Sequence, residues 1–396
     1  MRRPASPSTV APARYIFRIL HDFPASEVEV AWRRLLAQIE CPAHYDGPEF
    51  FSEPFWQGLN PFAVLAFADS AVVGVLTGLH THKEVVCGLA VRPQLCLHPC
   101  ADETSVMDCL ISGLLEEAGG TKLVSVHTWP RVGSEFQRRG FRPREFAGVV
   151  VVDLSIGARA LFDNFAPKRR RDIRLALRNG IEVSEQTTTE ELKEYWELYS
   201  AWRNTSRKQI LFSPLSFETM LKAYSLRESR RLFLARKDGK LIAASTIRFA
   251  PGGLIEYSGN CSLDEYLRLR PNDLLLWRIL EWGCENGFKK CSLGGTDEFH
   301  RKWSESVVPI YRYRQDRTLL RCHDRLEGLV TTAHSVFQKL PAGVKERARQ
   351  ALRRLAASSR LKSVGFARGP CPSGLSENHR IQVDTGNLKL ETVVRL

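Results

Sequence analysis

The stretch that decides the fold occurs twice, as Leu65-Ala-Phe-Ala-Asp-Ser-Ala-Val-Val-Gly74 and as Leu234-Ala-Arg-Lys-Asp-Gly-Lys-Leu-Ile-Ala243. The two copies align without a gap at a constant offset of 169 residues. Each consists of an apolar run, a turn that starts at Asp69 or Asp238, and a second apolar run. This order predicts a β-hairpin in each copy.

The segments downstream of both hairpins follow the same order. In the first copy a predicted helix, Cys109 to Ala118, ends at Gly119-Gly120 and precedes a strand at Leu123 to Val126. In the second, Asp273 to Asn286 ends at Gly287 and precedes Cys291 to Leu293. Glycine after the last helical turn supplies the left-handed conformation that closes a helix. The repeated hairpin, helix and strand indicate an internal duplication and an α/β protein of two similar halves.

The pattern between and after the copies sets the expected boundaries. Phe141 to Leu154 alternates as a strand, Leu161 to Asn179 reads as one helix, and further helices are expected over 189–203 and 214–224. After Arg321 the strand pattern stops. We expect a disordered leader at 1–14, a first domain at 15–155, a second and catalytic domain at 156–323, and a helical, flexible basic tail at 324–396.

Composition limits the class of protein. The chain has 396 residues, a net charge of +13 and 10 cysteines outside any regular disulfide framework. This predicts reduced thiols, a cytoplasmic location and attraction to polyanions such as nucleic acid or an anionic membrane surface. The apolar runs are too short for a transmembrane helix. Cys96, His98, Cys100 and Cys109 lack the paired spacing of a structural zinc site, so we expect no metal.

Three segments of the second copy carry a family resemblance. They are Arg270-Pro-Asn-Asp-Leu-Leu-Leu-Trp-Arg-Ile-Leu-Glu-Trp-Gly-Cys-Glu-Asn-Gly-Phe288, Cys291-Ser-Leu-Gly-Gly-Thr296 and Phe299-His-Arg-Lys-Trp303. Together with the basic helix at 168–180, they are similar to the Fem-type and BioF2-like (CelD-like) branch of the GNAT superfamily. The similarity extends over 161–313, and the first half joins it only through the repeat.

The resemblance implies two tandem GNAT-like domains, each a mixed, bent sheet flanked by helices. It further implies that a donor lies where the central strands separate, and that an uncharged amine attacks its carbonyl directly through an oxyanion intermediate. The donor is acetyl-CoA or another acyl-CoA in GNAT proteins, and aminoacyl-tRNA in Fem-type proteins.

Donor-binding candidates surround the expected start of the helix at residue 271. Asn272 is a good N-cap and Asp273 suits the first helical turn, but the Gly-rich pyrophosphate loop of GNAT proteins is missing. Arg268 and Arg270 can replace it as side-chain clamps. The turn Gly294-Gly295-Thr296 either approaches the substrate or serves only as a turn.

Catalytic candidates lie on the expected central strand and in the last of the three segments. His300 stands where the family has lysine, and its imidazole titrates near neutrality, so it can accept or donate a proton. If that segment is extended, Lys302 lies on the same face. Glu256 and Tyr257 are candidates for a base or for positioning the amine, although strand alternation allows only one of them to face the donor. Arg207, Tyr266 and Trp303 are the substrate-binding candidates, with a core role as the alternative for Trp303.

Three functions fit this pattern. The first is acyl transfer from acyl-CoA to an amine. The second is aminoacyl-tRNA-dependent transfer to a cell-envelope precursor or a protein, suggested by the missing pyrophosphate loop and by the basic helix. The third is a non-catalytic module that binds tRNA or a membrane surface, in which His300 has replaced the lysine.

Overall fold

The computed structural model describes residues 15–56, 58–81, 84–88, 95–129, 132–206, 216–225 and 228–339. Within them, thirteen strands form one mixed sheet in the order β1-β2-β3-β4-β6-β13-β7-β12-β11-β10-β9-β8, with β5 paired to β3. Of the described residues, those from 15 to 315 belong to one compact unit that contains both halves of the repeat, and 316–339 belong to a second unit.

The repeat is confirmed down to its irregularities. β2 (Asn60–Ala68) and β3 (Ala71–His80) form one hairpin, and β9 (Arg230–Lys237) and β10 (Lys240–Phe249) form the other. Asp69 and Asp238 both have a positive φ, of 54° and 51°. The pairing skips Val73 in the first hairpin and Ile242 in the second, again 169 residues apart. Both halves thus place the same β-bulge at the same point.

The helix that follows each hairpin leads to a parallel strand. In the first half α2 (Glu103–Ala118) connects β4 (Val85–Cys87) to β6 (Leu123–Thr128). In the second half α8 (Pro271–Glu285) connects β11 (Leu254–Ser262) to β12 (Lys290–Ser292). The helix closures at Gly119 and Gly287 have the expected positive φ. Each half therefore has a parallel strand pair at its centre.

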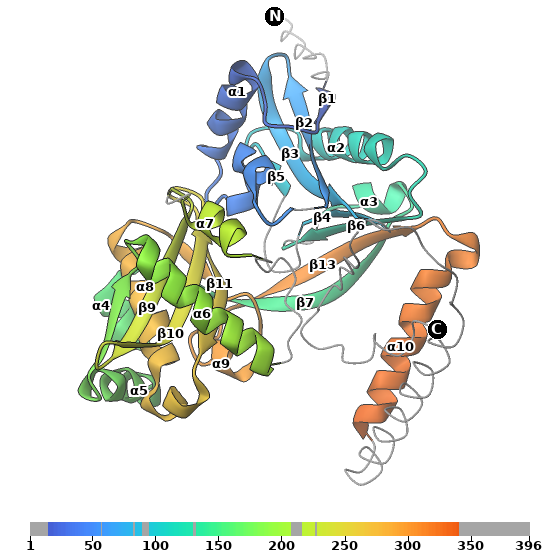
Figure 1. The fold of residues 1–396 in the computed structure, drawn as a ribbon. Helices are drawn as coiled ribbons and strands as arrows, with labels where there is room; N and C mark the ends of the chain where they lie inside the picture. Colours follow the sequence, from blue (N-terminus) through green and yellow to red (C-terminus); the bar gives the residue numbers. More distant parts are fainter. Residues whose placement is uncertain are drawn as a thin grey trace, which may run out of the picture. The chain divides into compact units, whose positions relative to one another are not determined.

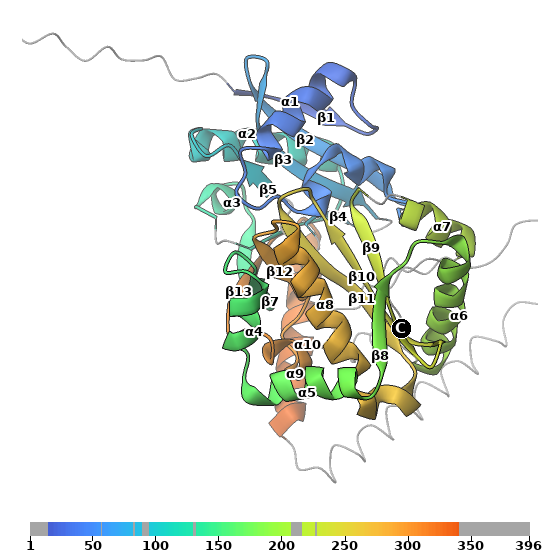
Figure 2. The same cartoon turned by 90° about the vertical axis from the view of Figure 1, so that its left-hand side faces the viewer.

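The two halves share strands at their junction. β7 (Arg142–Asp153), the last strand of the first copy, pairs with β12 of the second copy. β13 (Val307–Asp316), the last strand of the second copy, lies between β6 and β7. Figures 1 and 2 show these two long strands side by side. Backbone hydrogen bonds across this junction join both copies into a single sheet.

The remaining elements complete the layers. In the first half they are β1 (Tyr15–Leu20), α1 (Ser26–Leu36), η1 (His44–Asp46), η2 (Pro48–Ser52), β5 (Leu95–Leu97) and α3 (Glu135–Arg138). In the second they are α4 (Ala158–Asn164), α5 (Pro167–Arg178), β8 (Ile181–Glu185), α6 (Thr189–Ser206), α7 (Phe217–Ser225), η3 (Asp264–Leu269) and α9 (Glu298–Arg301). The single helix predicted over 161–179 is wrong, because Pro167 ends α4 and starts α5.

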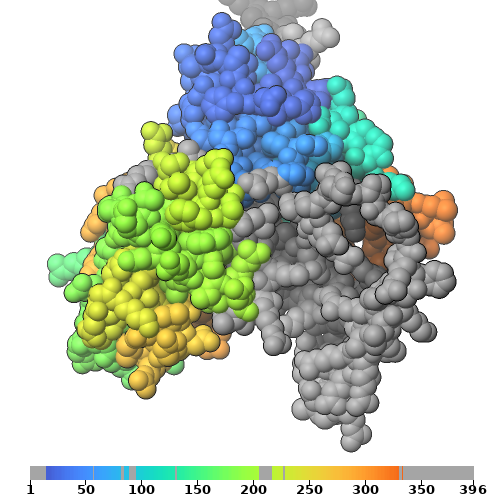
Figure 3. Space-filling view, in the orientation of Figure 1, coloured from blue at the N-terminus to red at the C-terminus, as the bar shows by residue number. Residues whose placement is uncertain are grey.

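Helices cover both faces of the second-half sheet. α8 packs on one face over a core that includes Ile247, Ile255 and Leu274, and α6 with α7 packs on the other over Leu234, Ala244 and Met220. Figure 2 shows α8 and α6 on opposite sides of β9, β10 and β11, and Figure 3 shows the outer surface of α6. Because helices cover both faces of this sheet, we look for functional polar side chains at the ends of its strands and at the starts of its helices.

The second unit contains η4 (Leu319–Arg321) and α10 (Cys322–Lys339). The helical character expected of the tail is present over 322–339 as α10, and the expected tail beyond 339 lies outside the described residues. In the part of the chain that the structure describes, no helix is both long and apolar enough to cross a bilayer.

Candidate active site

The parallel strands β11 and β12 separate early. They pair only over Leu254–Glu256 and Lys290–Ser292, whereas β11 continues to Ser262. The chain leaves β12 through a turn at Gly294, whose φ of 77° favours glycine. Tyr257 is the first β11 residue beyond the paired stretch, and the backbone oxygen of Tyr257 faces Gly294. The polar side chains of this region gather at that point.

A β-bulge brings two of these side chains onto one face. Ile247 pairs with Tyr257 and Ser245 pairs with Asn260, so the register shifts by one residue between them. The Tyr257 hydroxyl lies 3.2 Å from Ser245 Oγ, and Asn260 Nδ2 donates to the same Oγ at 2.9 Å. In a regular strand, residues three positions apart point to opposite faces. The bulge is therefore what allows Tyr257 and Asn260 to share Ser245.

The same hydrogen-bonded chain reaches the start of α8. Asn260 Nδ2 also lies 3.2 Å from Asn272 Oδ1, and Asn272 Nδ2 donates to Ser262 Oγ at 3.3 Å. The prediction that Asn272 caps α8 is wrong, because Arg270 holds the N-cap position and the Asn272 amide is engaged by β11. We call Ser245, Tyr257, Asn260 and Asn272, together with the neighbouring His300, the Tyr257 cluster.

His300 joins the cluster from α9. Its imidazole lies edge-on to the Tyr257 ring with 6.2 Å between centroids, and its side chain remains 16% exposed. Asp297 caps α9 by accepting from the His300 backbone N–H at 3.1 Å, and its other carboxylate oxygen lies 3.1 Å from Nδ1 at an angle unsuited to a hydrogen bond. Burial lowers the pKa of His300 and the Asp297 charge opposes that shift. Near neutral pH the imidazole is uncharged and able to accept a proton.

Tyr257 has the opposite character. It is almost fully buried, and burial raises the pKa of its phenol although Ser245 and Asn260 oppose the shift. The hydroxyl therefore keeps its proton at neutral pH and can donate it. A neutral imidazole and a neutral phenol side by side form a base and an acid within one cluster.

Two predicted catalytic residues point elsewhere. The segment with Lys302 is helical, not extended as the shared-face expectation required, and a two-residue spacing on a helix turns the side chains apart. Lys302 Nζ lies 2.7 Å from Glu298 Oε1 on the surface. Glu256 is buried on the face of β11 opposite Tyr257, as alternation demands, where its neighbours are Arg248 and His44.

The face that holds Glu256 carries a buried ionic cluster between the two halves. Glu53, from the segment after η2, accepts hydrogen bonds from Arg230 of β9 and from the Tyr45 hydroxyl. His44 Nε2 lies 3.8 Å from the same carboxylate, and the Arg248 guanidinium lies 5.5 Å from the Tyr45 ring. We call Glu53, Arg230, Arg248, His44 and Tyr45 the Glu53 cluster. It ties residues 44–53 to the start of β9 and the end of β10.

The first turn of α8 contains a buried ion pair. Asp273 contacts Arg169 of α5, and both are almost fully buried. The Arg169 guanidinium also lies 4.7 Å from the centre of the Trp303 ring, which is itself buried. The structure thus uses Asp273 and Trp303 to pack α5 against α8 and does not present them to a donor or a substrate. Arg169 is therefore a buried member of the otherwise basic and largely exposed helix α5.

The other candidates surround this helix start. Arg270 Nε lies 3.9 Å from Asp172 and the side chain is half exposed, while Arg268 is exposed on η3. Tyr266 packs against the core, and Lys240 Nζ lies 5.1 Å from the centre of its ring. Arg207 lies outside the described residues.

The turn Gly294-Gly295-Thr296 has a structural role that is visible. Gly295 O accepts from Val150 N of β7 at 3.0 Å, and Thr296 O accepts from Arg301 Nε at 2.7 Å. A Cβ added at Gly295 would lie 3.4 Å from His300 Nδ1. The turn therefore fixes α9 and the imidazole beside β11.

The starts of the equivalent helices α8 and α2 differ. The first turn of α2 is closed by Asp102, whose carboxylate accepts from Ser105 N at 3.2 Å. No side chain caps α8, and Arg270 precedes it with a φ of 66°. Pro271 has no N–H, and the amides of Asp273 and Leu274 donate to Arg270 O at 3.2 and 3.3 Å, so the start of α8 offers an anionic group its positive dipole end and few free amides. Arg169 neutralises the nearby Asp273.

Sequence reasoning missed Ser245, Asn260 and Arg169. Ser245 and Asn260 carry no local motif, and only the bulge in β11 brings them to Tyr257. The buried role of Arg169 was hidden within a run of basic residues. The prediction that the protein binds no metal stays a prediction. The residues that the structure describes contain no group of three or more His, Cys, Asp and Glu side chains placed to bind an ion.

Comparison with known families now identifies the second half. Residues 167–302 match the model of the GNAT acetyltransferase domain. This part of the chain is therefore similar to a GNAT domain. The match spans α5 to α9 and includes every described member of the Tyr257 cluster. No curated protein matches the sequence.

Solved structures extend the likeness to both halves. The crystal structure of FemX covers 76% of this chain and 98% of its own, with 13% identity and a TM-score of 0.58. The C-terminal domain of a putative lysylphosphatidylglycerol synthetase from Agrobacterium fabrum covers 76% and 97%, with 13% identity and a TM-score of 0.54. A tandem GNAT protein from the clavulanic acid pathway covers 77% and 99%, with 13% identity and a TM-score of 0.50. The tandem GNAT-like fold expected from the repeat is confirmed, and FemX shares it.

Proposed function

We propose that the protein transfers an acyl group from an acyl-CoA thioester to an amine, with the reaction at the Tyr257 cluster. The observation that carries the proposal is the convergence of a neutral imidazole and a neutral phenol where β11 separates from β12. Acyl transfer to an amine requires removal of a proton from the attacking nitrogen and stabilisation of a developing oxyanion or thiolate. The cluster offers a group for each task.

In this mechanism His300 is the base. Its Nδ1 faces Gly295 and Asp297, which leaves Nε2 to accept the proton of the amine as the new C–N bond forms. Tyr257 donates to the sulfur as the C–S bond breaks, and Ser245 with Asn260 holds its hydroxyl in place. Lys302 and Glu256 have no part in these steps, since the structure directs them away from the cluster.

The start of α8 is the proposed site for the diphosphate of the donor. Its uncapped first turn and the neighbouring Arg268 and Arg270 supply the positive field, and Asn272 connects it to the Tyr257 cluster. The bound donor supplies an activated thioester carbonyl. This arrangement does without the Gly-rich loop because side-chain guanidinium groups take over part of its task.

The experiment is a thiol-release assay with acetyl-CoA and a panel of primary amines, together with calorimetry of acetyl-CoA binding. Tyr257→Phe should lower kcat by about 10- to 1000-fold while acetyl-CoA still binds, because only proton donation is lost. Tyr266→Phe is the matched control, since that ring packs against the core outside the cluster. Absence of binding at millimolar acetyl-CoA would exclude the thioester donor.

A second function is favoured by the exposed face of α5. Its exposed basic residues are Lys168, Arg171, Arg174 and Arg178. The three arginines, together with Leu177, line a groove of about 460 Å³. Such a surface fits the phosphates of a tRNA, which is the donor in the aminoacyl-tRNA-dependent alternative.

That alternative predicts charged-tRNA binding with a steep salt dependence. Changing Arg171, Arg174 and Arg178 to Glu should flatten the slope, because fewer counterions are released on binding. Glu190→Arg on α6 changes charge away from this face and is the control. Binding to anionic vesicles but not to tRNA would instead indicate a membrane-surface contact, and consumption of either donor would exclude a non-catalytic module.

A further inference from the structure

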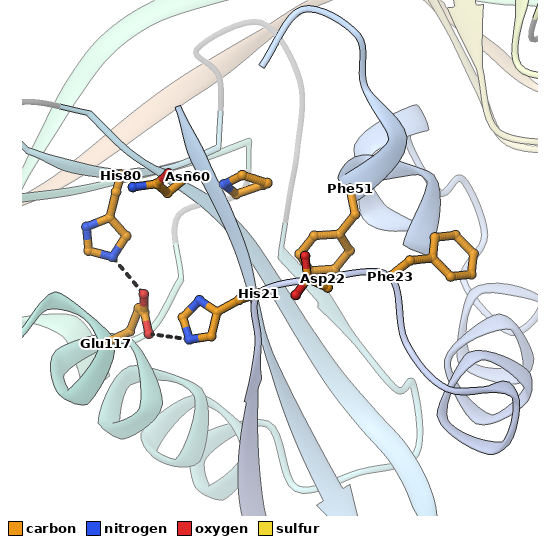
Figure 4. A pocket seen from close by; sticks show the side chains of 8 residues that line it. His21, Asp22, Phe23, Phe51, Asn60, His80 and Glu117 are labelled. Atoms are coloured by element: carbon orange, nitrogen blue, oxygen red, sulfur yellow. Dashed lines mark hydrogen bonds and ion pairs between the residues drawn. The ribbon is translucent and has the colours of Figure 1, made fainter. Parts of the chain in front are cut away.

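The first half contains an open groove of about 810 Å³ far along the sequence from the Tyr257 cluster. It is lined by His21, Asp22, Phe23, Phe51, Asn60, Pro61, His80 and Glu117. These residues come from the ends of β1 and β3, the start of β2, η2 and the last turn of α2. Figure 4 shows Glu117 between His21 and His80, with Phe23 and Phe51 on the other side of the groove. None of these residues takes part in the proposed transfer.

Glu117 is the polar centre of the groove. Its side chain is only 10% exposed, with Oε1 2.7 Å from His80 Nε2 and Oε2 3.5 Å from His21 Nε2. A carboxylate in the last turn of a helix opposes the helix dipole, and no basic residue stands in that turn of α2. Within the described ranges, no Lys or Arg contacts this carboxylate. The two histidines are therefore the side chains that partner this carboxylate among the described residues.

The rest of the lining suits a cation with an apolar stem. The chain has a net charge of +13, yet the groove contains two carboxylates, Asp22 and Glu117, and no basic residue except histidine. Phe23 is 45% exposed at the surface, and Phe51 forms part of the same wall. Aromatic faces next to a carboxylate attract ammonium and guanidinium groups.

We propose that this groove binds an organic cation, namely a primary ammonium or guanidinium group on an apolar stem, through Glu117. The cation contacts Oε2, since its nearest partner His21 is 61% exposed and can turn away, while His80 keeps Oε1. The stem lies against Phe23 and Phe51. A bare metal ion is a poorer occupant, because no metal-binding group of three or more side chains is found in the described part of the chain.

The test is a calorimetric titration of the full chain with hexylammonium and with neutral 1-hexanol at pH 8. Hexylammonium should bind at least 10-fold more tightly than hexanol, and Glu117→Gln should remove that preference. Glu116→Gln changes the adjacent, exposed carboxylate and should leave binding unchanged. Equal affinity for amine and alcohol, or undiminished binding to Glu117→Gln, would overturn the proposal.

A second variant covers the case in which Glu117→Gln does not fold. Asp22→Asn alters an exposed side chain at the mouth of the groove and should weaken hexylammonium binding about 3-fold by reducing the local negative field. No change in this variant would also count against the groove. Because the groove shares no residue with the Tyr257 cluster, these titrations are independent of whether the chain transfers an acyl group.

Discussion

Replacing Glu53 with Gln tests whether the Glu53 cluster holds the two halves together. The Glu53 side chain is fully buried and that of Arg230 is 2% exposed. Gln keeps the shape and removes the charge, which leaves the Arg230 guanidinium buried without its carboxylate. Removing one partner of a buried ion pair costs about 3–5 kcal/mol. We expect a loss of that size in the free energy of unfolding.

The matched control is Glu49→Gln. Glu49 lies four residues earlier and is 2.6 Å from Arg33, but its side chain is 37% exposed and that of Arg33 is 46% exposed. Solvent screening limits such a pair to about 1 kcal/mol or less. Both variants are compared with the wild type by urea denaturation, followed by tryptophan fluorescence. Equal losses for the two variants would refute the reasoning, because burial would then not distinguish the two carboxylates.

The pH dependence gives a second readout of the same cluster. Burial alone would raise the pKa of Glu53, but Arg230, His44 and Arg248 lower it well below 4.5. Since the folded-state pKa lies below the unfolded one, the contribution is present above about pH 4.5 and is lost as the pH falls through the folded-state pKa. The stability of Glu53→Gln should therefore vary less with pH in the acid range than that of the wild type.

Three further predictions concern other charged groups. Asp297→Asn keeps the α9 cap but removes the charge that raises the His300 pKa. The acid limb of the pH profile of kcat/KM should therefore move to lower pH. An acid limb at the wild-type pH would contradict the role of His300 as base. Arg169→Met and Asp273→Leu should each lower the free energy of unfolding by about 3–5 kcal/mol. The double variant should lose less than the sum in a double-mutant cycle measured by urea denaturation, and additive losses would exclude a stabilising interaction between the two side chains. Burial raises the pKa of Asp46 to about 7, above its usual value of 3.8. The contribution of Asp46 to the free energy of unfolding is therefore full below pH 3.8 and is lost, by about 4 kcal/mol, as the pH rises to 7. Asp46→Asn should flatten this slope in denaturation at a series of pH values, and an unchanged slope would contradict the assignment.

The local features of the fold were predictable because they depend on neighbours in the chain. The hairpins at 65–74 and 234–243 follow from alternating apolar runs and from turn residues, and the glycines that close α2 and α8 follow from backbone freedom. The break at Pro167 was also available in the sequence, because proline disfavours continuation of a helix, but the apolar pattern on both sides concealed it.

The candidate site was only partly predictable. Tyr257 was found on the expected central strand and His300 in a family motif, yet whether the two meet depends on the separation of β11 from β12. Lys302 was misplaced because a four-residue helix replaced the expected extended segment. Asp273 was assigned to the donor because its partner, Arg169, is 104 residues away in the sequence and meets it only when α5 packs on α8.

The sequence by itself determined that the chain is a duplicated α/β protein and which half resembles a transferase. Both conclusions depend on periodicity, turn residues and short motifs, which are local properties of the chain. Only the tertiary structure decided which polar groups share a site. Three features join residues that are distant in the chain. They are the exchange of β7 and β13 between the halves, the bulge that puts Tyr257 and Asn260 on one face, and the burial of Glu53 with Arg230. Such contacts form because packing and desolvation act between surfaces, and a linear pattern does not specify which surfaces will meet.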